Sequence, residues 1–207
     1  MMTISIVLLI VSLINLTCSQ IPNPKRYQLT TTRDGYFQEH YSIDRNLNKA
    51  SRKGYSYENN LLQLLRQDIY LPNHDITYTF KFYKSPTSCT ATKCSPFDYI
   101  DHRSNLVETF GGENKKYDEL IFDANCDGEC LTWSKEYNNP AAEIILKNTL
   151  YIKKDNMIPI KHTSKIYNTK TGQLTMDLTD RFSNWNLNEI QDLEYNFPMD
   201  VNRCFNQ

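Results

Sequence analysis

The sequence lacks a strong charge imbalance, a flexible linker and, beyond its first residues, any long apolar run. Lysine and arginine together number 23 and aspartate and glutamate 24, which gives a formal net charge of -1. This balance gives no reason to expect nucleic acid or an anionic membrane surface as a partner. No Gly/Ser-rich linker, charge block or internal repeat divides residues 20–207, and no apolar run within them is long enough to span a bilayer. We therefore expect one domain without a stable membrane span.

The common catalytic motifs are also absent. The chain has no G-x-S-x-G elbow, no H-E-x-x-H helix and no glycine-rich phosphate loop. In "CDGECLTW", Leu131 and Thr132 separate Cys130 from Trp133, whereas the signature of papain-like proteases needs an aromatic residue directly after the nucleophile. The four histidines are scattered along the chain, and none has ligand spacing with another. We therefore predict a protein that is not an enzyme and that holds no metal or cofactor.

The N-terminus has the pattern of a secretory signal. Residues 4–16 are an apolar run without a charged side chain, which suits the core of a signal peptide and is short for a membrane span. Thr17 and Ser19 satisfy the small-residue rule for cleavage before Gln20. We expect residues 1–19 to be a signal peptide and residues 20–207 to be a single secreted domain, located outside the cell or in the lumen of the secretory pathway.

The stretch "FDANCDGECLTW", residues 122–133, fits three different structures. Asp123, Asn125 and Asp127 have the spacing of an EF-hand calcium loop, but Ser134 stands at the twelfth position, where a bidentate Glu is needed. A zinc site could join the Cys126/Cys130 pair to an earlier pair at residues 89 and 94. However, structural zinc sites usually have tighter C-x2-C spacing, and an oxidising secretory route favours disulfides. The prediction is a disulfide corner between strands.

Five cysteines remain after the predicted cleavage, and they imply two bridges and one unpaired thiol. They are Cys89, Cys94, Cys126, Cys130 and Cys204. The spacing does not fix the connectivity. The position of Cys204 near the C-terminus suggests a staple for the last strand, with Cys89 or Cys94 as its partner.

Most of the chain has the period-2 alternation of half-buried strands. "GYFQEHYSID" and "ITYTFKFY" alternate apolar and polar residues, and similar runs continue to "QLTMDLTDRF". Helical patterns are limited to residues 95–110 and 187–193, and the apolar cluster at residues 59–70 fits either a strand or a helical turn. The predicted fold is mainly β (α+β), with a long antiparallel sheet.

The second half of the chain, roughly residues 118–205, resembles the LolA-like half-β-barrel domain of secreted counting-factor-associated, papain-related proteins. More distantly, it resembles ependymin-related proteins. The matching pieces occur in order: "GECLTW", "KNTLY", "MIPIKHTSKIYN", "TGQLTMDLTDRFSN" and "LEYNFPMDVNRC". The histidine that accompanies the glycine of the late strand in the family has no counterpart beside Gly172, and no peptidase domain is present, so protease activity does not carry over. The resemblance implies a curved antiparallel sheet forming a half-barrel around one or two short helices.

The resemblance further implies that the concave face binds a lipid or another hydrophobic small molecule. The chain holds 14 Tyr, 9 Phe and 2 Trp, and such side chains line either a cavity or an ordinary core. The expected cavity wall, read from strand faces, consists of Phe80, Phe82, Trp133, Ile144, Leu146, Tyr151, Ile160, Ile166, Leu178 and Trp185. The alternative hypothesis is an extracellular interaction factor with a filled core and a protein partner, one form of which regulates a cysteine protease.

Overall fold

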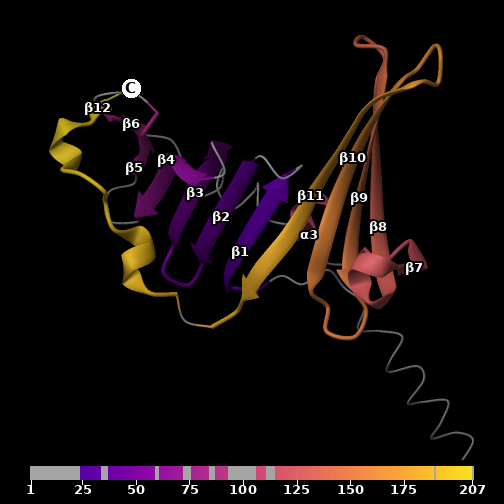
Figure 1. Ribbon diagram of the computed structural model, residues 1–207, viewed down its shortest axis with the longest axis horizontal. Coiled ribbons are helices and arrows are strands. Elements are labelled where there is room, and N and C mark those ends of the chain that lie inside the picture. Colours follow the sequence, from indigo (N-terminus) through magenta and orange to yellow (C-terminus); the bar gives the residue numbers. More distant parts are fainter. Residues whose placement is uncertain are drawn as a thin grey trace, which may run out of the picture.

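The computed structural model describes residues 24–33, 37–58, 61–71, 76–83, 87–92, 106–110, 115–188 and 190–206. The predicted signal peptide and Cys94 lie outside these residues. The described strands form one sheet of 12 strands in the order β12-β6-β5-β4-β3-β2-β1-β11-β10-β9-β8-β7 (Figure 1). Neighbouring strands are antiparallel, except that β12 runs parallel to β6. The mainly β, antiparallel prediction is confirmed at this level.

The longest strands are β3, β4 and β8 to β11, with 10 to 13 residues each. The bounds of the described strands are β1 Arg26–Arg33, β2 Phe37–Asp44, β3 Lys49–Glu58, β4 Leu61–Leu71, β5 Ile76–Lys81, β6 Ser88–Thr92, β7 Glu119–Asp123, β8 Gly128–Asn139, β9 Ile144–Lys153, β10 Pro159–Asn168, β11 Leu174–Asn186 and β12 Phe205–Asn206. The ambiguous cluster at residues 59–70 contributes to strand β4, which pairs with β3 and β5 and is buried on both faces near Asp68.

Helix is scarce among the described residues. Of the helix expected at residues 95–110, residues 95–105 lie outside the described part of the chain, and α3 spans Leu106–Thr109. The helix expected at residues 187–193 does not form. In its place is a short 3₁₀ turn, η2 (Asp192–Tyr195), that begins later. Helices in proteins are stabilised mainly by burying an apolar face, yet Leu187 and Leu193 are exposed. Two more 3₁₀ turns are η1 (Ala124–Cys126) and η3 (Val201–Arg203).

The strand register defines two faces of the sheet, because side chains directly opposite each other on paired strands lie on the same side. His162 pairs with Asp180, Asp180 with Arg33, and Leu29 with Tyr41, so these residues share one face with Arg52, the partner of Tyr41. We call this the inner face. The opposite side is the outer face.

Each face carries part of the hydrophobic core. On the inner face, α3 packs its apolar side chains against Trp133 and Leu150. Farther along that face, Leu29 and Ile43 belong to a second cluster. On the outer face of β4 to β6, the C-terminal segment (residues 190–206) covers a third cluster around Phe80. Figure 1 shows this segment, in yellow, beside β3 to β6 at the far end of the sheet from β7.

Candidate functional site

The inner face contains a cavity of about 510 Å³ beneath α3. Its lining comes from six strands and the helix: Leu29, Thr31, Arg33, Phe37, Glu39, Tyr41, Arg52, Arg66, Leu106, Thr109, Phe110, His162, Asp180 and Phe182. Five strand-to-strand steps separate β4 from β10, which is about 24 Å in a flat sheet. Side chains from both strands nevertheless line the same cavity, so the sheet curves around it and the inner face is its concave side.

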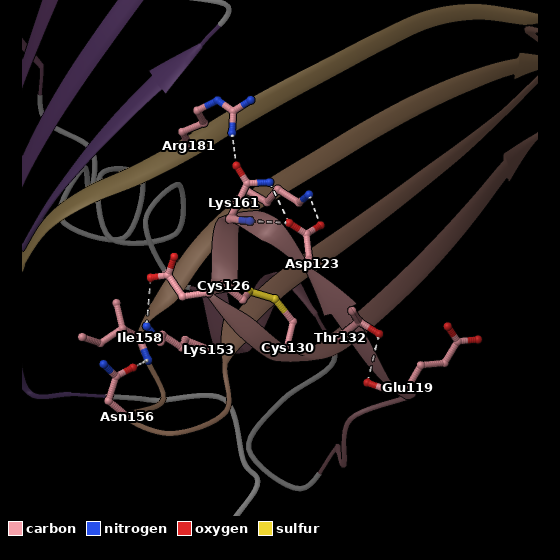
Figure 2. Close-up of a disulfide and its surroundings, with 12 residues drawn as sticks. Glu119, Asp123, Cys126, Cys130, Thr132, Lys153, Asn156, Ile158, Lys161 and Arg181 are labelled. Carbon is pink, nitrogen blue, oxygen red and sulfur yellow. Dashed lines mark hydrogen bonds and ion pairs between the residues drawn. A yellow bond between two sulfur atoms is a disulfide. The ribbon is translucent and has the colours of Figure 1, made fainter.

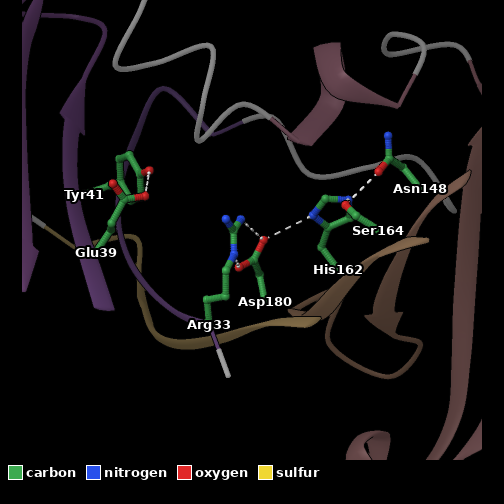
Figure 3. Close-up of polar contacts among 7 residues, drawn as sticks. All are labelled: Arg33, Glu39, Tyr41, Asn148, His162, Ser164 and Asp180. Carbon is green, nitrogen blue, oxygen red and sulfur yellow. Dashed lines mark hydrogen bonds and ion pairs between the residues drawn. The ribbon is translucent and has the colours of Figure 1, made fainter. Parts of the chain in front are cut away.

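A charged cluster joins the two halves of the sheet at the cavity (Figure 3). Arg33 on β1 donates from Nε and Nη2 to the two carboxylate oxygens of Asp180 on β11, at 2.7 and 2.8 Å. His162 Nδ1 on β10 lies 3.6 Å from Asp180 Oδ2. Burial alone would raise the pKa of Asp180, but the hydrogen bonds from His162 and Arg33 and the charge of Arg33 outweigh it and lower the pKa to about 2. Asp180 is therefore a fixed negative charge at neutral pH.

The cluster continues along β10 and β9. His162 Nε2 lies 3.3 Å from Ser164 Oγ, and the Ser164 hydroxyl donates to Asn148 Oδ1 at 2.8 Å. Asp180, His162 and Ser164 thus stand in the order of a hydrolase triad. Two features oppose that chemistry. The hydroxyl proton is directed to Asn148 rather than to His162. In addition, β10 is paired on both sides, so its amides are used in the sheet and supply no oxyanion hole.

A second charged cluster lies on β3 and β4. Arg52 binds the carboxylate of Asp68 from Nε and Nη2, at 2.9 and 2.6 Å, and Arg66 Nε binds its other oxygen at 2.9 Å. Thr79 also donates to Asp68, at 2.6 Å. Asp68 is almost completely buried, and burying a charge is costly unless it is paired and hydrogen-bonded. Glu39 accepts the Tyr41 hydroxyl at 2.6 Å, as Figure 3 shows.

Beyond the charged cluster, the inner face of β8 to β11 carries a row of apolar side chains. One row crosses four strands, with Tyr137 opposite Leu146, Leu146 opposite Ile166, and Ile166 opposite Met176. Tyr137 and Met176 are 58% and 46% exposed, and the other two side chains are half-buried. Leu178 lies between Met176 and Asp180 on the same face of β11. We call these five residues the apolar row. It leaves apolar surface accessible immediately next to the charged cavity.

Four of the ten predicted wall residues lie on this part of the inner face: Ile144, Leu146, Ile166 and Leu178. Trp133, also on the inner face, is fully buried under α3. Trp185 stacks on Tyr27, with ring centroids 5.4 Å apart. Ile160 lies at a bulge between Pro159 and Lys161.

The remaining predicted wall residues lie elsewhere. Phe80 and Phe82 pack with the C-terminal segment at the outer-face core. Tyr151 faces outward, because it pairs with Lys161, whose ammonium lies 4.3 Å from the Tyr151 ring centroid. None of the ten residues lines the 510 Å³ cavity. The sequence reasoning looked for apolar side chains and so missed the charged ones, Arg33 and Asp180 above all. Asp180 had one signal, since it alternates with Leu178 and Phe182 along the strand, whereas Arg33 follows a run of threonines and had none.

The stretch at residues 122–133 forms the predicted disulfide corner (Figure 2). Cys126 and Cys130 are bonded, closing the turn between β7 and β8. Asp123 accepts from the amide of Asn125 at 2.8 Å and forms an ion pair with Lys161. Burial would raise the pKa of Asp123, but the hydrogen bonds from Lys161 and Asn125 lower it to about 2. One oxygen of this carboxylate is used within the turn and the other by Lys161, and strands rather than helices flank the turn.

The second bridge joins Cys89 to Cys204, which confirms the predicted staple and selects Cys89 as its partner. Of the four cysteines in the alternative zinc site, Cys89, Cys126 and Cys130 are held in disulfides, and Cys94 lies outside the described residues. Among the described residues, no group of three or more His, Cys, Asp or Glu side chains is arranged to hold a metal ion. Within the same residues, no helix has the length and apolar character needed to cross a membrane.

Comparison of the sequence with models of protein families gives no match, and comparison with curated proteins gives no significant match. The resemblance to the LolA-like domain therefore stays a prediction. The open curved sheet is compatible with a half-barrel.

Proposed function

We propose that this protein is a secreted, non-enzymatic carrier that binds a lipid or another amphipathic small molecule on its inner face. The observation that carries the proposal is the position of the apolar row directly beside a charged cavity on the same concave surface. A ligand with a polar end and an apolar chain matches both parts at once. Ligand sites are typically concave and largely apolar, with a few well-placed polar groups.

Three further observations support this proposal. The apolar row is accessible, although burying apolar surface is favourable by about 25 cal/mol per Å². A bound chain would remove this area from water. The charged cluster favours binding over catalysis, because Ser164 is hydrogen-bonded to Asn148 and the strand offers no oxyanion hole. The two disulfides suit an oxidising, extracellular location. N-terminal sequencing of the secreted chain, with Gln20 expected as the first residue, tests that location.

The first experiment is native mass spectrometry of the secreted protein, followed by organic extraction, with binding of a fluorescent fatty-acyl probe measured in parallel. The test variant is Leu146→Gln combined with Ile166→Gln, which places polar groups in the apolar row. The matched control is Lys147→Gln on the outer face of the same strand, where the ion pair to Glu136 is solvent-exposed and contributes little.

We expect the wild-type protein and the control to bind the probe and the double variant to lose at least about tenfold in affinity, since two apolar contacts of roughly 1 kcal/mol each are removed. A protein that carries no lipid and binds no probe would refute the carrier function. In that case, the same exposed row would favour the alternative, contact with an extracellular protein.

A further inference from the structure

We propose that the ligand has an anionic headgroup, a carboxylate or a phosphate, that binds to Arg33 and Arg66 in the cavity. This inference rests on the proposed function and specifies the class of ligand. It begins from the way in which the ion pairs of the cavity are oriented.

In both principal ion pairs, the arginine is the outward partner. The side chain of Arg33 is 49% exposed, whereas that of Asp180 is 15% exposed. The side chain of Arg66 is 39% exposed, whereas that of Asp68 is 2% exposed. Each carboxylate is therefore covered by its arginine. The two pairs contain equal numbers of positive and negative charges, but the positive groups are the more exposed. The surface that the cavity presents to a ligand is therefore more cationic than this count suggests.

The other charged groups strengthen this asymmetry. Arg52 is buried and also binds Asp68, so the Asp68 carboxylate is held by two guanidinium groups, those of Arg52 and Arg66. Glu39 is only 18% exposed, accepts the Tyr41 hydroxyl and lies 3.8 Å from Arg52. These contacts hold the negative charges against the sheet. A guanidinium group has five N–H donors in a planar fork that matches the oxygens of carboxylates and phosphates.

The positions of these groups fit a single extended ligand. Asp180, which anchors Arg33, is followed on the same face of β11 by Leu178 and then Met176. At about 3.3 Å per residue, these lie roughly 7 and 13 Å away along the strand. A headgroup at Arg33 therefore leaves its chain at the start of the apolar row. Arg66, on β4, stands at the other end of the cavity lining, whereas Phe110 packs edge-to-face on His162, with ring centroids 5.5 Å apart.

The test is a matched series of dodecyl ligands, measured by calorimetry below the critical micelle concentration of each charged ligand and below the solubility limit of dodecanol. The series consists of dodecanoate, dodecyl phosphate, dodecanol and dodecylamine. The variants are Arg33→Gln and Arg66→Gln, singly and combined. The control is Arg181→Gln, since Arg181 lies on the outer face of β11 next to Asp180 and hydrogen-bonds Asn125.

We expect the two anionic ligands to bind at least about tenfold more tightly than dodecanol, and dodecylamine to bind most weakly, as charge-assisted hydrogen bonds to arginine are strong. The double variant should lose this preference while its affinity for dodecanol stays unchanged, and Arg181→Gln should behave as the wild type. The relative affinities of dodecanoate and dodecyl phosphate identify which headgroup is preferred.

The outcomes separate this inference from the function on which it rests. Equal binding of all four ligands by the wild-type protein would overturn the anionic headgroup and leave the carrier function intact. Preference for dodecylamine would also overturn it. Failure of every ligand to bind would refute the carrier function itself. The wild-type series decides the question even if a variant fails to fold.

Discussion

The two disulfides should contribute very different amounts to stability, because they close loops of very different length. Cys89 and Cys204 are 115 residues apart in the sequence, whereas Cys126 and Cys130 are 4 apart. In the chain-entropy treatment, the first cross-link stabilises the folded state by about 5 kcal/mol and the second by about 2 kcal/mol. The predicted difference between the two bridges is therefore about 3 kcal/mol.

The perturbation is the removal of each bridge by a pair of alanine substitutions, Cys89→Ala with Cys204→Ala and Cys126→Ala with Cys130→Ala. Alanine is preferred to serine because Cys89, Cys126 and Cys130 are buried, and a buried hydroxyl without a partner is destabilising. Each pair of substitutions removes two sulfur atoms. The packing losses therefore largely cancel in the comparison.

The assay is equilibrium unfolding in urea, followed by fluorescence and circular dichroism, with thermal unfolding as a second measurement. For a domain of this size, the 3 kcal/mol difference corresponds to a gap of roughly 6–12 °C between the two melting temperatures. Hydrogen exchange should also show faster exchange in the C-terminal segment and β5 when the Cys89–Cys204 bridge is absent. An equal or larger loss from removing the Cys126–Cys130 bridge would refute the reasoning from loop length.

Three further predictions concern single residues. In Asp180→Asn, the free energy of unfolding at pH 7 should fall by about 1 kcal/mol. Because the pKa of Asp180 is lowered to about 2, this contribution is present above pH 4 and disappears as the pH falls towards 2. The unfolding curves of the variant and the wild type should therefore converge near pH 2. Asp68→Asn should cost about 3–5 kcal/mol in urea unfolding, because the buried Arg52 guanidinium loses the carboxylate at 2.6 Å and keeps the more distant Glu39, at 3.8 Å; a loss below 1 kcal/mol would contradict this. Trp133→Ala should lower the free energy of unfolding by about 3–5 kcal/mol, since the indole is fully buried under α3 and donates to the Lys115 carbonyl at 3.1 Å. The control is Tyr137→Ala on the same strand, which should be nearly neutral because Tyr137 is 58% exposed.

The local sequence pattern was sufficient to predict the strands and the disulfide corner. Alternation at residues 37–44 and 76–81 predicted β2 and β5, because a strand with one buried face must repeat every two residues. At Cys126 and Cys130, the Asp and Gly residues between them favour a turn, and the cysteines are close enough in sequence to pair within it. The helix at residues 187–193 was predicted wrongly, because its leucines find no surface to bury them.

The sequence by itself therefore determined that the chain forms an antiparallel sheet, and that a disulfide corner closes one of its turns. Both are decided by neighbours in the chain. Only the tertiary structure decided which strands meet, and with them the site. Arg33 and Asp180 are 147 residues apart and become partners because β1 pairs with β11. Pairing between distant strands and the curvature of the sheet depend on the whole chain at once. No local pattern could therefore predict that the arginines are the exposed partners that cover their carboxylates.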